Sequence, residues 1–195
     1  MRFNKSYTSA AANLTGFASN VTGATFTLTA SNAGDTLAHK VTIRNDTGNS
    51  HAGKTVTLVG TDYNGAALTE IVTGPGAGAT VSSTGYFLTL TSATPSATIG
   101  ADTFDIGWAA DAATAPVNVQ PKTGAGAYAI GISVDATGTP AYSLQQSYGG
   151  EWFAHAVIAT KTASADGSLL FPVLALRLIF TAASTVALNI VGLGQ

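Results

Sequence analysis

Thr55-Val56-Thr57-Leu58-Val59-Gly60 is followed by Asp62-Tyr63-Asn64-Gly65 and then by Leu68-Thr69-Glu70-Ile71-Val72-Thr73. In the first and third segments, apolar and β-branched residues alternate with polar ones at the period of two that is typical of a strand. Asn-Gly accepts the positive φ angles of a type I′ turn. The stretch therefore predicts an antiparallel β-hairpin.

The same pattern recurs outward from this hairpin in both directions. Short runs rich in Thr, Val and Ile are separated by Gly, Asn, Asp and Pro, which is typical of many short strands joined by tight turns. Val41 and Ile43 face inward in Lys40–Asn45, and Val186, Leu188 and Ile190 share a face near the C-terminus. We expect an all-β fold, an antiparallel β-sandwich or a jelly-roll-like arrangement. Residues 7–17 fit either a helix or an extended arm.

The chain is expected to divide into three parts. Residues 1–30 have weak periodicity and are interpreted as an N-terminal arm, residues 31–112 as one β-sandwich unit, and residues 113–195 as a second. The two units have similar order, because Tyr148 follows Tyr63 after 85 residues and Phe171 follows Phe87 after 84. Identities are few, so an internal duplication and a chance alignment of Thr-rich strands both remain open.

Charge is scarce in this chain. Charged residues make up 9% of the 195 residues, hydrophobic residues make up 46%, and the formal net charge is −2. An average soluble domain has about 25% charged residues. The eight Lys and Arg residues are scattered, whereas a protein that binds nucleic acid usually clusters them. The pattern argues against nucleic-acid binding. It favours self-association or assembly over a monomer with a hydroxyl-rich surface, because little repulsion opposes contact.

The search for chemistry assigns no residue to catalysis, to a cofactor or to a metal. Cysteine is absent, and no pair among His39, His51 and His155 has the spacing of a helical zinc site. Most carboxylates lie in predicted turns, where Asp bonds to nearby backbone N–H groups. Asp102 and Asp105 are the one pair that could act as in a glycosidase. We expect a protein that is not an enzyme.

No membrane association is expected either. The N-terminal residues lack the continuous apolar segment of a signal peptide. The most apolar stretch, residues 169–180, is too short for a helix that spans a bilayer, which needs about 20 apolar residues.

Four aromatic residues lie at or near predicted turns: Tyr63, Trp108, Tyr148 and Trp152. Tyr and Trp are enriched among the residues that dominate protein interfaces. We interpret the four as candidate interface anchors or as residues that pack in the core. A row of exposed rings that stacks on sugars is the alternative.

Residues 59–75, with their Asp62-Tyr63-Asn64-Gly65 turn, resemble a segment of the small β-rich virion proteins of tailed bacteriophages. Residues 86–92, 171–178 and 186–190 add to the likeness, which covers roughly residues 40–108 and 165–195. It is a pattern of strands and turns, and it carries over no functional residue.

The resemblance implies a capsid decoration or cement protein, made in the host cytoplasm and placed on the capsid surface. Its partners would be the major capsid protein and further copies of itself, often as trimers. Two alternatives remain: another virion component of the tail, neck or fibre, and a carbohydrate-binding adhesin module.

Overall fold

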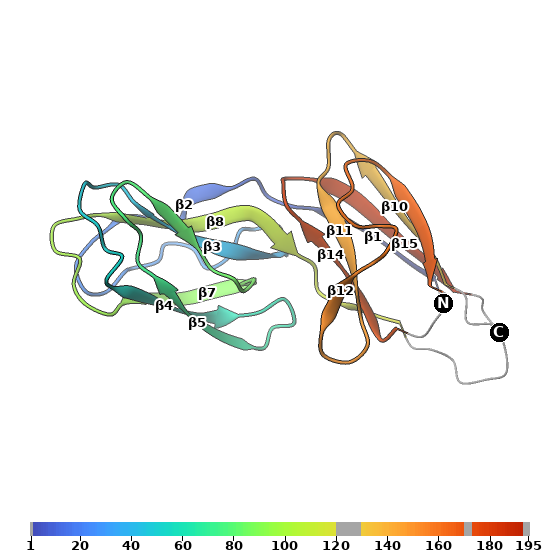
Figure 1. The fold of residues 1–195 in the computed structure, drawn as a ribbon, viewed down its shortest axis with the longest axis horizontal. Coiled ribbons are helices and arrows are strands. Elements are labelled where there is room, and N and C mark those ends of the chain that lie inside the picture. Colours follow the sequence, from blue (N-terminus) through green and yellow to red (C-terminus); the bar gives the residue numbers. More distant parts are fainter. Residues whose placement is uncertain (1, 120–129, 170–172, 193–195) are drawn as a thin grey trace. The chain divides into compact units, whose positions relative to one another are not determined.

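In the computed structural model, which describes residues 2–119, 130–169 and 173–192, the described residues form strands joined by turns and contain no helix (Figure 1). The all-β prediction is confirmed. The chain divides into two compact units. We call Ala10–Ala113 the inserted unit. The split unit consists of Met1–Ser9 and Thr114–Gln195, because the inserted unit interrupts it in the sequence.

The inserted unit is an antiparallel sandwich of two sheets. One sheet has the order β2-β8-β3-β6, and the other has the order β5-β4-β7. Apolar residues from both sheets form one buried cluster that includes Ile43, Leu58 and Ile106. The strands are β2 (Asn13–Val21), β3 (Ala38–Asn45), β4 (Thr55–Thr61), β5 (Ala67–Thr73), β6 (Thr80–Ser82), β7 (Thr89–Pro95) and β8 (Phe104–Ala113).

The split unit also consists of two antiparallel sheets. Its first sheet has the order β1-β15-β10-β13, and its second contains β12-β11-β14, with β9 paired to β14. Ile132 and Leu188 of the first sheet and Leu144 of the second are almost fully buried. The strands are β1 (Arg2–Thr8), β9 (Val117–Asn118), β10 (Ile130–Thr137), β11 (Tyr142–Ser147), β12 (Trp152–Ala154), β13 (Ala165–Leu169), β14 (Ala175–Phe180) and β15 (Thr185–Gly192).

The two units repeat one topology. The order β2-β8-β3-β6 corresponds strand for strand to β1-β15-β10-β13, and β5-β4-β7 corresponds to β12-β11-β14. The two hairpins that the sequence aligned, β4–β5 and β11–β12, take equivalent places. This correspondence supports an internal duplication, which the sequence had left open. Phe171, which also entered the sequence alignment, lies outside the described residues.

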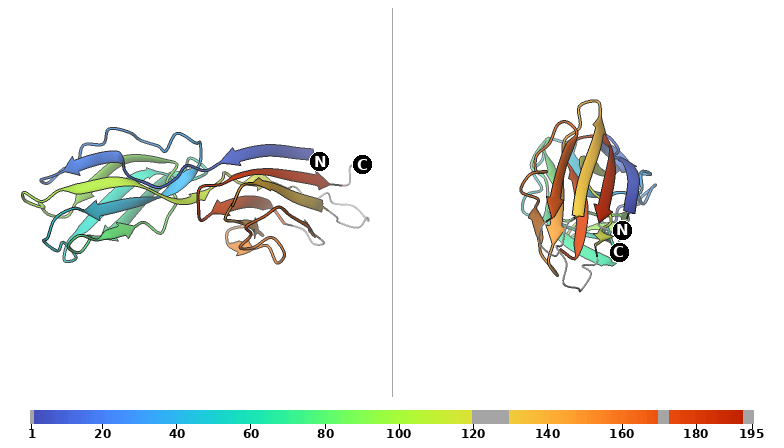
Figure 2. Two further views of the ribbon diagram at one scale, coloured as in Figure 1. Left: turned by 90° about the horizontal axis from the view of Figure 1, so that it is seen from above. Right: turned by 90° about the vertical axis from the view of Figure 1, so that its right-hand side faces the viewer.

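Residues 1–30 do not form a separate arm, and residues 7–17 are not a helix. β1 pairs with β15 from Arg2↔Val191 to Thr8↔Thr185, and the two strands lie side by side in Figure 2. β2 pairs instead with β8 of the inserted unit. The physical reason is burial: Tyr7 and Phe17 are 7% and 1% exposed, so each strand contributes to a core. The division between the units falls after Ala113, where the sequence placed it after residue 112.

The predicted hairpin at residues 55–73 is confirmed, but its turn differs from the expected type. β4 and β5 pair from Thr55↔Thr73 to Thr61↔Ala67. Only Gly65 of the turn has a positive φ, at 79°, so Asn64 does not adopt the type I′ conformation. The Asp62 carboxylate organises the turn instead, because it accepts hydrogen bonds from the Asn64 and Ala66 N–H groups at 2.8 and 2.9 Å.

Candidate interaction surfaces

The outer face of sheet β5-β4-β7 presents a uniform surface, which we call the threonine face. The pairing places its residues in rows across the three strands, such as Ile71–Thr57–Thr94 and Thr69–Val59–Ser92. The face consists of Thr55, Thr57, Val59, Thr61, Ala67, Thr69, Ile71, Thr73, Thr89, Ser92 and Thr94. No position on it is ionisable, and seven of its residues are threonine.

The local sequence explains why this face is uncharged. Alternation places Val56 and Leu58 on the opposite side of β4, where they are 1% and 0% exposed. The register between β4 and β7 shifts at a β-bulge between Val59 and Gly60. At Gly60 the two strands are so close that an added Cβ would lie 1.9 Å from the Thr89 carbonyl oxygen. The Thr61 and Thr89 hydroxyls are 2.7 Å apart and bond to each other. Ile71 and Val59 stand among these hydroxyls and are 67% and 36% exposed.

The threonine face can dock on a neutral protein surface without removing any ion from water, which avoids the main cost of burying polar surface. Three strands of seven residues cover about 300 Å², from a strand spacing of about 4.8 Å and a rise of about 3.3 Å. A standard interface buries about 800 Å² on each partner. One such face therefore gives a weak contact by itself, and it becomes strong where many copies bind a repeating partner.

The two aromatic candidates in the inserted unit lie in partly buried positions. Trp108 on β8 donates its indole N–H to the Ala11 carbonyl oxygen at 3.0 Å, and its ring contacts Phe17 edge-on at 5.1 Å. It packs against the core cluster, which fits the core role that the sequence also allowed. Tyr63 is half-buried in the turn between β4 and β5.

The two aromatic candidates in the split unit belong to the β11–β12 hairpin. Tyr148 is 46% exposed, and its ring lies 5.9 Å from that of Phe153, which is 47% exposed. The guanidinium group of Arg177 stacks over Trp152 at 4.3 Å. Phe153 was not among the four candidates. It lies on β12, the edge strand of its sheet, where it is 47% exposed, and strand periodicity does not say which strand is at the edge.

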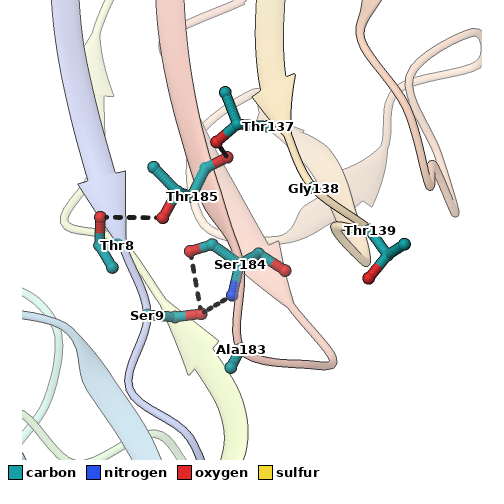
Figure 3. A pocket seen from close by; sticks show the side chains of 8 residues that line it. All are labelled: Thr8, Ser9, Thr137, Gly138, Thr139, Ala183, Ser184 and Thr185. Carbon is teal, nitrogen blue, oxygen red and sulfur yellow. Dashed lines mark hydrogen bonds between the residues drawn. The ribbon is translucent and has the colours of Figure 1, made fainter.

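A hollow of about 300 Å³ lies at one end of sheet β1-β15-β10-β13 (Figure 3). Hydroxyl groups line most of it, and they largely bond to one another and to the backbone: the Thr8 and Thr185 hydroxyls are 3.2 Å apart, and the Ser184 N–H donates to the Ser9 hydroxyl at 3.0 Å. It contains no carboxylate and no imidazole. The lining residues are Thr8, Ser9, Thr137, Gly138, Thr139, Ala183, Ser184 and Thr185.

Two histidines of the inserted unit are buried against carboxylates. The His39 ring bonds to Asp35 at 2.7 Å and to the Ala109 carbonyl at 2.9 Å, and it is 1% exposed. His51 bonds to Asp102 at 2.7 Å. Burial raises the pKa of Asp35, but hydrogen bonds from His39 and from two backbone N–H groups outweigh it and hold the pKa below its ordinary value. The His39–Asp35 and His51–Asp102 pairs hold the loops that contain Asp35, His51 and Asp102 against the sandwich.

The possible glycosidase pair, Asp102 and Asp105, is occupied by internal contacts. Asp105 is 1% exposed, accepts the Asn20 N–H at 2.9 Å and pairs with Arg44. Burial raises its pKa, but the hydrogen bonds from Asn20 and Arg44 outweigh burial, and the pKa lies below its ordinary value. Hydrogen bonds from His51 and Asn49 likewise lower the pKa of Asp102. Glycoside hydrolysis needs one carboxyl that keeps its proton, and these two carboxyl groups favour the ionised form.

Within residues 2–119, 130–169 and 173–192, no three His, Asp or Glu side chains gather as metal ligands. The same residues contain no helix that could cross a membrane. Comparison of the chain with protein-family models, with curated proteins and with solved structures found no match.

Proposed function

We propose that this chain is a non-enzymatic structural subunit of a virion, a decoration or cement protein that binds and stabilises a tailed-phage capsid shell. The observation that carries the proposal is the threonine face, a sheet surface without an ionisable group and with Ile71 exposed at 67%. Covering such a surface with a protein neighbour buries apolar area and costs no ion desolvation.

The chemistry of the whole chain supports the same function. Only 9% of its residues are charged, so copies crowded on a shell repel one another weakly. The partners would be the major capsid protein and other copies of this chain, and the location would be the capsid surface after synthesis in the host cytoplasm. Two sandwiches in one chain give two folded units that can each contact a partner, so weak individual faces can add up by avidity.

A carbohydrate-binding module is the second candidate, and one observation favours it. Tyr148 and Phe153 are both about half exposed and lie 5.9 Å apart at a hairpin end, where rings could stack on a sugar. A glycan array probed with the purified chain separates the two functions. Binding that is lost in a Tyr148→Ala variant would support the module, and the absence of binding to any glycan would count against it.

The decoration function is tested by finding where the chain resides. Particles purified from an infected culture on a density gradient should carry the chain in a fixed ratio to the major shell protein, measured by quantitative mass spectrometry. Incubation of depleted particles with purified chain should restore that ratio and raise the temperature at which the shell opens. A chain that stays entirely in the soluble fraction, with or without added particles, would contradict the proposal.

A further inference from the structure

The two units differ at one place in their shared topology. In the inserted unit, β5 stays paired with β4 over its whole length. In the split unit, β12 ends at Ala154, and pairing resumes only where Lys161 bridges Tyr142. Residues 155–160 bulge out between these points, and we call them the bulge loop. The loop is tied to β11, because the His155 N–H donates to the Leu144 carbonyl at 2.8 Å and the Leu144 N–H donates to the Ile158 carbonyl at 2.7 Å.

One imidazole ring holds the bulge loop. His155 is 4% exposed, and its Nδ1 accepts hydrogen bonds from the N–H groups of Val157 and Ile158, each at 3.2 Å. A backbone N–H can only donate, so Nδ1 must carry no proton and the ring must be neutral. The turn also places Ile158 in the core, at 0% exposure, and leaves Val157 55% exposed.

The surroundings of the ring do not compensate a positive charge. A Cβ on Gly167 of β13 would lie 3.0 Å from the ring, so that strand packs directly on it. The charged residues on the adjoining elements are Glu151, Lys161, Asp166 and Arg177, and none of them forms an ion pair with His155 within the part of the chain that the structure describes. Burial lowers the pKa of His155, and a hydrogen bond with the Ser168 backbone opposes this in part.

The backbone of the bulge loop is itself unfavourable. Thr160 has a φ of 52°, in the left-handed region that β-branched residues rarely adopt. Its N–H donates to the Ser143 hydroxyl at 2.8 Å, which holds the residue there. A loop with such a strained backbone persists only while interactions with its surroundings hold it in place. His155 and Ser143 help to do so, through their hydrogen bonds to the N–H groups of Val157, Ile158 and Thr160.

We propose that the bulge loop is an acid-sensitive latch: protonation of His155 at Nδ1 turns the acceptor of two backbone hydrogen bonds into a donor, so the loop opens. Opening withdraws Ile158 from the core and frees the Leu144 N–H on β11, which exposes an unpaired stretch of strand edge. The latch is closed at neutral pH and opens under mild acid. It concerns the split unit alone and does not depend on the proposed role in a capsid.

The latch is tested by amide hydrogen exchange of the full chain between pH 8 and pH 5, corrected for the intrinsic pH dependence of exchange. Protection of the Val157, Ile158 and Leu144 amides should fall by about tenfold per pH unit below the ordinary His pKa of about 6.5, as expected for uptake of one proton on opening. The Ile190 amide in β15 should keep its protection and serves as the internal reference. Unchanged protection of the loop amides down to pH 5 would overturn the proposal.

The matched variant is His155→Asn. The Asn Oδ1 atom can take the place of Nδ1 as acceptor and does not titrate, so the loop should stay protected at pH 5. The same acid-dependent loss in this variant would show that another group opens the loop. A nuclear magnetic resonance titration of the wild-type imidazole is a second measurement that does not depend on the folding of a variant. The shifts of the Val157 and Ile158 amides should follow the His155 midpoint, and a midpoint above about 6.5 would refute the latch.

Discussion

An Ile71→Lys substitution tests the threonine face. Ile71 lies across from Thr57 and is 67% exposed. Full burial of such a side chain contributes about 1.5–3 kcal/mol, so about 1–2 kcal/mol remains to be gained when a partner covers it. Loss of this contact alone should weaken binding about 5- to 30-fold, because about 1.4 kcal/mol corresponds to a factor of ten. The lysine adds the cost of a charge against an uncharged surface.

The assay is binding of purified chain to depleted shells, measured as bound copies against free concentration, with thermal unfolding of each variant in parallel. Unfolding should change little, because most of the Ile71 side chain already faces solvent. Asn64→Lys, at an exposed position of the β4–β5 turn, adds the same charge off the face and should bind like the wild type. Wild-type affinity of the Ile71→Lys variant would refute the docking role of this face.

Three further predictions concern the fold itself. Leu58→Ala should lower the free energy of unfolding by about 2–5 kcal/mol in chemical denaturation, because Leu58 is fully buried. Gly60→Ala should destabilise the chain by about 1–3 kcal/mol or more, since its Cβ would meet the Thr89 carbonyl oxygen at 1.9 Å, whereas Gly53→Ala, with no atom within 4 Å, should change stability by less than about 0.5 kcal/mol. Stability should also fall as pH drops below the ordinary Asp value of 3.8, because the lowered pKa of Asp35 makes the unfolded chain bind that proton first; thermal melts of Asp35→Asn should lose this part of the acid dependence.

The alternation of apolar and polar residues predicted where most strands lie. It did not predict which strands pair when they are far apart in the sequence. The alternation around Val56 and Leu58 identifies a hairpin because both strands and their turn lie within 19 consecutive residues, Thr55–Thr73. The pairing of Arg2 with Val191 cannot be recognised from the neighbouring residues, because the pattern of one strand does not identify the strand that pairs with it. For that reason residues 1–30 resembled a loose arm, although β1 and β2 complete two different sandwiches.

The candidate surface could be predicted only in part. The composition shows that charge is scarce. It does not show that one sheet face lacks charge, because that depends on the strand pairing that places Ile71, Thr57 and Thr94 in one row. The Glu70 carboxylate, on the other side of β5, accepts the N–H groups of Thr84 and Gly85 at 2.7 and 2.9 Å. Partners that distant loops supply cannot be deduced from strand periodicity. The two backbone hydrogen bonds that the buried His155 accepts could likewise not be deduced from its place in the sequence.

The most direct test is a cryo-electron microscopy reconstruction of a particle that carries this chain. We expect density for the chain at regular positions on the shell, with the side chains of Ile71 and Val59 covered by a neighbouring subunit. A reconstruction in which the whole β5-β4-β7 sheet faces open solvent, while another part of the chain makes the attachment, would contradict this expectation.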